Sequence, residues 1–90
     1  MPLFAVICQD KPGALETRKA NRDAHLSYLK QTNVVQAGPF LDTAGMMCGS
    51  LLILDLPDMA AAQNWAKNDP YAKADLFASV DIQQWNRVIG

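Results

Sequence analysis

Residues 46–58, MMCGSLLILDLPD, decide how this chain folds. The stretch 46–56 is an apolar run rich in strand-forming residues, which predicts a buried β-strand, and Pro57 closes it. Asp58 then occupies an N-cap position ahead of 59–66, MAAAQNWA, a strong helix former. The segment therefore predicts a long strand that passes directly into a helix.

The residues before this segment predict a hairpin. A turn at 42–45, DTAG, precedes the strand, and 34–40 reads as a second, shorter strand with Gly38 and Pro39 near its end. Because proline has no N–H to donate to a neighbouring strand, Pro39 places this strand at an edge of the sheet.

The rest of the chain completes a regular order of elements. We expect a strand at 3–8, a helix at 14–31 and a last strand at 80–89. Asp69 followed by Pro70 ends the second helix and begins a short further turn. The order βαββαβ is that of a ferredoxin-like α+β domain, an antiparallel four-stranded sheet with both helices on one face, in a single domain over 1–90.

Half of the 90 residues are hydrophobic, which is a large share for one small domain to bury. The strands at 3–8 and 46–56 are apolar on both faces, whereas helices cover only one. We therefore expect a homodimer through the uncovered sheet face, since two-fold dimers are the commonest oligomers. The alternative is a monomer with over-hydrophobic central strands.

Composition argues against several functions. Eight Lys and Arg against nine Asp and Glu give a net charge of −1 with no basic run, which argues against nucleic-acid binding. Two cysteines make neither a disulfide scaffold nor a zinc site, and no cofactor fingerprint occurs. The N-terminal apolar run is too short for a signal sequence or a membrane span. We expect a cytoplasmic protein that uses neither metal nor cofactor and does not bind membranes.

The helix at 14–31 carries the first candidate for chemistry. At about 100° per residue, Arg18, Arg22 and His25 fall within roughly 60° of one another on or beside the apolar stripe. Buried charge is costly unless it is paired, so this placement needs a reason. One reading is structural, with two arginines lying along the core edge beside a hydrogen-bonded histidine. The other is a site where His25 exchanges protons and an arginine holds an anion.

Asp69 is the second candidate. Alone it reads as a helix-ending Asp-Pro turn, but it is also a possible carboxylate partner for His25. In the expected topology the two heights differ by roughly 7 Å, which side chains and helix tilt can close. Such a partner would fix the imidazole tautomer and raise its basicity. Ser50 could add a hydroxyl contact, and Gly38 and Gly49 could let a ligand approach the backbone.

These positions together resemble the YCII-related family of small bacterial proteins. The likeness extends over most of the chain and rests on the following segments: Gln9-Asp10, Arg18, Arg22, 25–29 (HLSYL), 37–39 (AGP), Gly49-Ser50, 69–71 (DPY) and 80–85. The resemblance implies a dimeric α+β barrel with an active site centred on His25 and Asp69. It implies that Gly38, Pro39 and Ser50 belong to the same pocket, and we add Tyr71 as core or pocket wall.

The chain departs from the family pattern at two places, so the substrate is not carried over. Ala74-Asp75-Leu76 stands where Ala-Gly-Leu is common, and Gln83-Gln84 replaces a basic residue or proline. We expect a small-molecule enzyme of the lyase, dehydrohalogenase or isomerase type. In it His25 is the acid or base, Asp69 its partner and Arg22, ahead of Arg18, the anion clamp. The rival interpretations are a non-catalytic ligand-binding dimer and an interaction subunit without a pocket.

Overall fold

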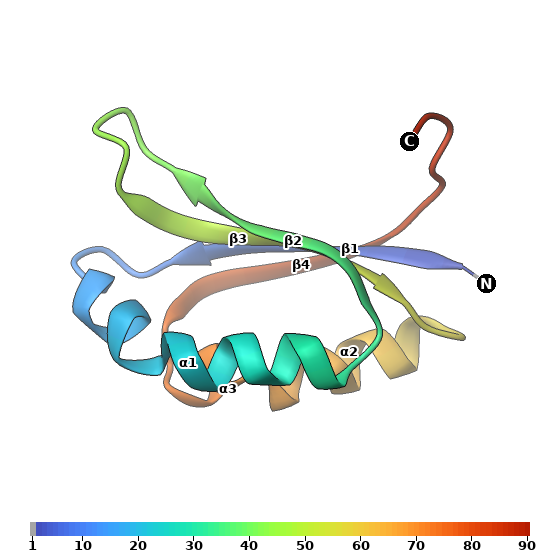
Figure 1. Cartoon of the computed structure of the whole chain (residues 1–90), viewed down its shortest axis with the longest axis horizontal. Helices are drawn as coiled ribbons and strands as arrows, with labels where there is room; N and C mark the ends of the chain where they lie inside the picture. The colour runs from blue at the N-terminus through green and yellow to red at the C-terminus, as the bar shows by residue number, and fades with distance from the viewer. Residues whose placement is uncertain (1) are drawn as a thin grey trace.

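The computed structural model describes residues 2–90, and its elements follow the expected βαββαβ order with one short additional helix. The elements are β1 (Leu3–Asp10), α1 (Leu15–Gln31), β2 (Val34–Leu41), β3 (Met47–Asp55), α2 (Met59–Asn68), α3 (Pro70–Lys73) and β4 (Phe77–Trp85). The strands form one layer and the three helices lie together under one of its faces (Figure 1).

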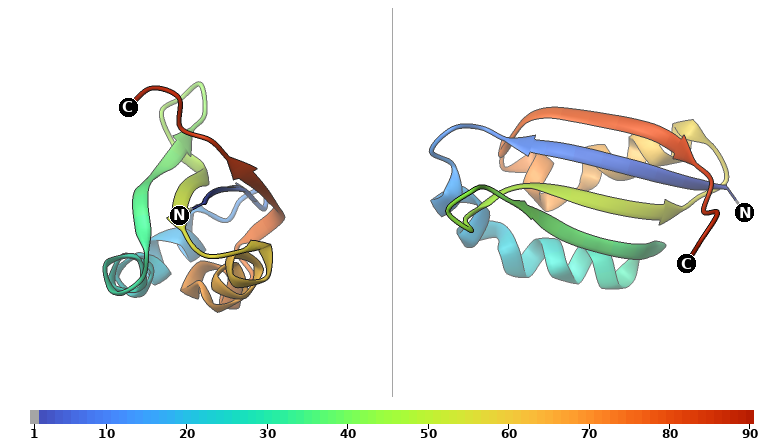
Figure 2. Two further views of the ribbon diagram at one scale, coloured as in Figure 1. Left: turned by 90° about the vertical axis from the view of Figure 1, so that its right-hand side faces the viewer. Right: turned by 90° about the horizontal axis from the view of Figure 1, so that it is seen from above.

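The four strands pair in the order β2-β3-β1-β4, and every neighbouring pair is antiparallel (Figure 2, right). This confirms the ferredoxin-like fold, and it confirms the edge position that Pro39 predicts for β2. The two central strands β1 and β3 are the two apolar runs of the sequence. They pair through Ala5 opposite Ile53 and Val6 opposite Leu52.

Two aspartates set the boundaries of the C-terminal helices. The Asp58 carboxylate accepts the backbone N–H of Ala61 at 2.8 Å, which confirms it as the N-cap of α2. Asp69 ends α2 and also caps α3, where Pro70 takes the first helical position. The chain therefore changes direction at Asp69 and holds its side chain in place with two helix ends.

The last strand differs from the expected range of 80–89, since β4 runs from Phe77 to Trp85. Its partner explains the shift. Phe77 pairs with Asp10 and Trp85 pairs with Leu3, so β4 begins and ends where β1 does. Beyond Trp85 the neighbouring strand offers no further residue to pair with, and the apolar Val88 and Ile89 are left exposed.

The helix side of the sheet holds the core. Phe4, Val6 and Cys8 of β1 pack with Leu52 and Leu54 of β3, together with α2 side chains. The alternate residues of the same strands face the other way, where no helix lies (Figure 2, left). Within residues 2–90, no helix is long and apolar enough to cross a membrane.

Candidate active site

His25 and Asp69 meet beneath the sheet, 44 positions apart in the chain. His25 projects inward from α1 and Asp69 from the junction of α2 and α3, and both side chains are buried. The imidazole Nδ1 lies 2.7 Å from the carboxylate Oδ1 of Asp69. Because a carboxylate only accepts hydrogen bonds, this contact holds the imidazole proton on Nδ1 and leaves the Nε2 lone pair free.

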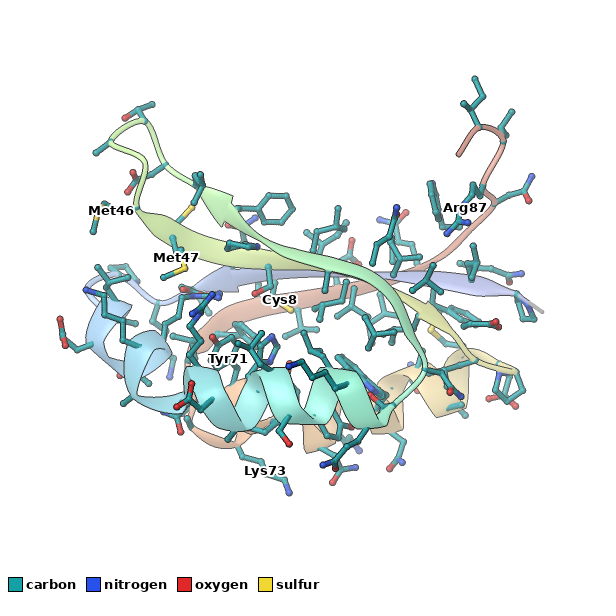
Figure 3. The ribbon with its side chains drawn as sticks, in the orientation of Figure 1. Cys8, Met46, Met47, Tyr71, Lys73 and Arg87 are labelled. Carbon is teal, nitrogen blue, oxygen red and sulfur yellow. The ribbon has the colours of Figure 1, made fainter. Side chains whose placement is uncertain are left out.

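Tyr71 completes the immediate surroundings of the imidazole. Its ring stacks on that of His25 with centroids 3.8 Å apart and planes 12° apart. Its backbone N–H donates to Oδ1 of Asp69 at 3.0 Å, the same oxygen that contacts His25. The Asp-Pro-Tyr segment therefore holds the imidazole through two contacts. Asp69 binds it at the ring edge through a hydrogen bond, and Tyr71 packs against the ring face. Figure 3 shows Tyr71 between the helical layer and the sheet.

Arg18 is buried and belongs to an ion pair. Its Nε and Nη2 donate to the two carboxylate oxygens of Asp10 at 2.7 and 2.8 Å, and Nη2 also donates to Oγ of Ser50 at 2.9 Å. Burial lowers the pKa of Arg18, but the Asp10 carboxylate raises it more, so the net pKa lies above its usual value. Much of the donor capacity and charge of Arg18 is therefore committed within the protein.

Arg22, one helical turn further on, is exposed and lines the same pocket. Within residues 2–90 it forms no ion pair, in contrast to Arg18. A guanidinium with free donors at a pocket entrance is suited to bind carboxylate or phenolate oxygens.

These residues surround a cavity of about 190 Å³ between α1, α3, β2 and β3. Seven of the nine residues expected at the site line the cavity, and the other two, Gly49 and Asp69, do not. The seven are Arg18, Arg22, His25, Gly38, Pro39, Ser50 and Tyr71. Five apolar residues that we did not predict form the remaining wall: Leu26, Leu29, Ala37, Met47 and Leu52. The cavity lining thus combines polar and apolar side chains.

Asp10 is the polar residue that sequence reasoning did not place in the network. A signal for it exists, because an arginine on a buried helix stripe needs a carboxylate, and Asp10 lies at the end of the adjacent strand. The expectation for Gly49 was wrong. A Cβ at Gly49 would collide with the carbonyl oxygen of Cys8, so this glycine permits the approach of β1 rather than of a ligand. Gly38 has open space beside it.

Two further ionisable groups near the site remain protonated at neutral pH. Burial raises the pKa of the Tyr71 phenol, although the positive charges of Arg18 and Arg22 oppose the increase. Burial, aided by the negative charge of Asp69, raises the pKa of the Cys8 thiol to about 12. Cys8 lies on the helix side of β1 and is part of the core (Figure 3). Its thiol is therefore a poor nucleophile.

The described residues 2–90 contain no group of three or more His, Cys, Asp or Glu side chains that could hold a metal ion. The polar groups of the cavity are instead one imidazole, two guanidinium groups and two hydroxyl groups. This set suits proton transfer to and from a bound molecule that carries anionic oxygens.

Solved structures similar to this chain include one of high similarity. It is 5-chloro-2-hydroxyhydroquinone dehydrochlorinase (TftG) from Burkholderia phenoliruptrix, in complex with 2,5-dihydroxybenzoquinone, with a TM-score of 0.88, 33% identity and 93% of each chain covered. An antibiotic biosynthesis monooxygenase matches with a TM-score of 0.57 but only 14% identity, which shows the shared fold alone.

Comparison of sequences gives the family. The chain is 34% identical to an uncharacterised protein of Haemophilus influenzae, with 94% of this chain and 97% of that protein covered. It is 32% identical to the protein YciI of Escherichia coli, with 96% and 98% covered. The model of the YCII-related domain matches residues 2–86. The chain therefore belongs to the YCII-related domain family.

Proposed function

We propose that this protein is an acid–base enzyme of the lyase, dehydrohalogenase or isomerase type that acts on a small hydroxylated or anionic ring compound. The observation that carries the proposal is the 2.7 Å contact between His25 and Asp69 at a cavity whose other polar groups are cationic or hydroxylic. The similarity to a dehydrochlorinase with a bound dihydroxybenzoquinone supports the same class of ligand.

His25 is the proton-transfer group in this proposal. With Nδ1 engaged by Asp69, Nε2 has no partner within residues 2–90 and can accept a proton from a bound molecule. Asp69 orients the ring and stabilises the imidazolium that forms, as the acidic member of a catalytic triad does. Arg22 holds the anionic oxygen of the substrate, and Arg18, which Asp10 neutralises, has a lesser part in binding.

The reaction needs no redox step. Nε2 of His25 takes a proton from a C–H or O–H group of the ring, and the electron pair left behind moves to an adjacent ring oxygen or forms a new double bond. In an elimination, a leaving group such as chloride departs with its own bonding electrons. The imidazolium then returns its proton to product or solvent. Isomerisation differs only in that the proton returns to another ring atom.

The test combines ligand screening with His25→Ala. A panel of chlorinated and hydroxylated hydroquinones, phenols and small acids is screened by thermal shift, and bound compounds are followed by chromatography for products. We expect conversion by the natural protein and a loss of at least 100-fold in His25→Ala, with unchanged fold and oligomeric mass. Binding without conversion would favour a non-catalytic ligand-binding protein. Collapse of the variant would instead identify a structural histidine.

We also propose that the functional unit is a homodimer joined through the sheet face that no helix covers. Leu51 and Trp85 are exposed on this face, which leaves a large apolar surface in contact with water. Figure 3 shows Arg87 on the same side of the sheet, away from the helices. A second copy placed there by a two-fold axis would remove this apolar surface from water on both copies at once, because contacts across such an axis are reciprocal.

A further inference from the structure

The hydrogen-bonding character of the cavity is strongly one-sided. Neither of the two buried carboxylates lines the cavity. Asp10 accepts from Arg18 through both oxygens, and Asp69, behind His25, accepts from His25 and from the Tyr71 backbone through Oδ1. A ligand in the cavity therefore finds no carboxylate in the cavity lining to accept its own O–H or N–H groups.

The two hydroxyl groups of the cavity have the opposite character. Ser50 accepts a hydrogen bond from Nη2 of Arg18 at 2.9 Å, and the proton of its own hydroxyl has no acceptor within residues 2–90. The side chain near the phenol oxygen of Tyr71 is Arg18, whose guanidinium can only donate, so the phenol proton has no acceptor within those residues either. Both side chains are more than nine-tenths buried and line the cavity.

A buried hydroxyl that donates to no acceptor is costly, and the cost is removed when a ligand accepts the bond. Arg22 adds further free N–H donors at the same cavity. The one nitrogen acceptor at the cavity is Nε2 of His25, which the proposed function assigns to the proton in transfer. The hydroxyl oxygens of Ser50 and Tyr71 can also accept, but their two protons and the N–H groups of Arg22 give the cavity an excess of donors.

We propose that the hydroxyls of Ser50 and Tyr71, together with Arg22, form a donor array that selects ring compounds bearing two or more anionic or carbonyl oxygens. The inference rests on the proposed function and names the substrate class for it: hydroxyquinones, their ring enolates and related oxygen-rich anions. The same array hydrogen-bonds the oxygen on which negative charge develops when His25 removes a proton, as an oxyanion hole does.

The size of the cavity agrees with a single ring. An apolar cavity of about 150 Å³ accommodates benzene in another protein, and the cavity here measures about 190 Å³. Leu26, Leu29 and Leu52 supply the apolar wall against which a ring face packs. The ring oxygens of such a ligand would then meet the hydroxyl and guanidinium groups of the lining.

The test uses 2,5-dihydroxybenzoquinone as the acceptor-rich probe and hydroquinone as the donor-rich probe of similar shape. Dissociation constants are measured by titration calorimetry, and the visible spectrum of the bound quinone reports the hydrogen bonds to its oxygens. The variants are Tyr71→Phe and Ser50→Ala. Tyr28→Phe is the matched control, because it removes a phenol that donates to the Trp65 carbonyl outside the cavity.

We expect the natural protein to bind the quinone at least tenfold more tightly than hydroquinone. We also expect Tyr71→Phe and Ser50→Ala each to lose about tenfold or more in quinone affinity, with a shifted spectrum, because each deletes a hydrogen bond to a charged oxygen. Tyr28→Phe keeps the affinity. Hydroquinone affinity changes little in all three.

Two other outcomes overturn the inference in different ways. If the quinone binds and His25→Ala still abolishes turnover, but Tyr71→Phe and Ser50→Ala bind as well as the natural protein, the donor array is wrong and the proposed function stands. If the natural protein neither binds nor converts any ring compound of the panel, both proposals are wrong.

Discussion

The two faces of the sheet are built from the same central strands, yet they differ in how their polar groups are paired and their apolar side chains covered. On the helix side, the buried charges are paired: Arg18 with Asp10, and His25 with Asp69. On the other side, large apolar side chains are exposed, and polar atoms of Asp55 and Arg87 are buried without partners within residues 2–90. The buried charges of the first face are paired within one chain, whereas the second face leaves apolar side chains uncovered.

The difference shows what a buried polar group requires. A charge beside an apolar core is tolerated only where the fold supplies its counterpart. On the helix side the counterparts come from distant parts of the same chain, and the result is a preorganised cavity. On the open side, residues 2–90 supply no such counterpart for the buried atoms of Asp55 and Arg87. We therefore interpret the first face as the site of chemistry and the second as the site of assembly.

The largest effect is expected from breaking the ion pair on the helix side. Asp10→Ala leaves the Arg18 guanidinium buried without its carboxylate, so we expect a loss of about 3–5 kcal/mol in the free energy of unfolding. Chemical denaturation measures it. Asp23→Ala, which removes an exposed carboxylate from α1, is the control and should change stability by less than about 0.5 kcal/mol.

A double variant sharpens this prediction. Asp10→Ala combined with Arg18→Met removes both charges and should recover much of the lost stability, since an apolar replacement of a buried pair is often nearly neutral. A loss below about 1 kcal/mol in Asp10→Ala alone would mean that solvent reaches the guanidinium.

The next effect concerns the open face. Leu51→Lys places a charge at the centre of the proposed dimer interface, where burial costs several kcal/mol, so we expect a dimer-to-monomer transition. Light scattering after gel filtration should give twice 9.9 kDa for the natural protein and 9.9 kDa for the variant. Ala60→Lys adds the same charge on the exposed side of α2 and should stay dimeric. A natural protein that is monomeric at all concentrations would refute the dimer.

The smallest effect concerns the pH dependence of stability on the helix side. Burial raises the pKa of the Cys8 thiol from its usual 9.0 to about 12, so the folded state keeps a proton that the unfolded chain releases. The free energy of unfolding should therefore fall as pH rises above 9. Raised pKa values of the buried phenols Tyr28 and Tyr71 act in the same direction.

Cys8→Ala isolates the contribution of the thiol. The variant is less stable at pH 7 because it leaves a small cavity, but its stability should fall less steeply between pH 9 and 11. Urea denaturation at a series of pH values measures both. Equal slopes in the two proteins would mean that the thiol titrates as freely in the folded state as in the unfolded one.

Much of the fold follows from local patterns along the chain. The apolar runs of β1 and β3, the N-cap at Asp58, the Asp-Pro junction and the edge proline each specify an element or a boundary without reference to distant residues. The end of β4 does not follow from a local pattern. It is set by the extent of β1, the strand with which β4 pairs. The apolar and polar residues at 77–89 contain no signal for that partner.

The candidate site divides in the same way. Helical spacing alone places Arg18, Arg22 and His25 on one sector of α1, and their unusual position on an apolar stripe marks them. Helical spacing does not show which of the two arginines is buried in an ion pair and which is free to bind a ligand. Only the packed structure buries Arg18 against Asp10 and leaves Arg22 free at the cavity, since this depends on how α1 lies over β1.

The sequence by itself therefore determined which elements form, in which order, and that cationic side chains lie where a core is expected. These properties depend on periodicity, capping and residue type, which act over a few residues. The tertiary structure alone decided that Asp69 meets His25 at 2.7 Å, that Tyr71 stacks on the imidazole, and that Asp10 pairs with Arg18. Such contacts join residues many positions apart, and only the packing of helices on the sheet fixes their distances.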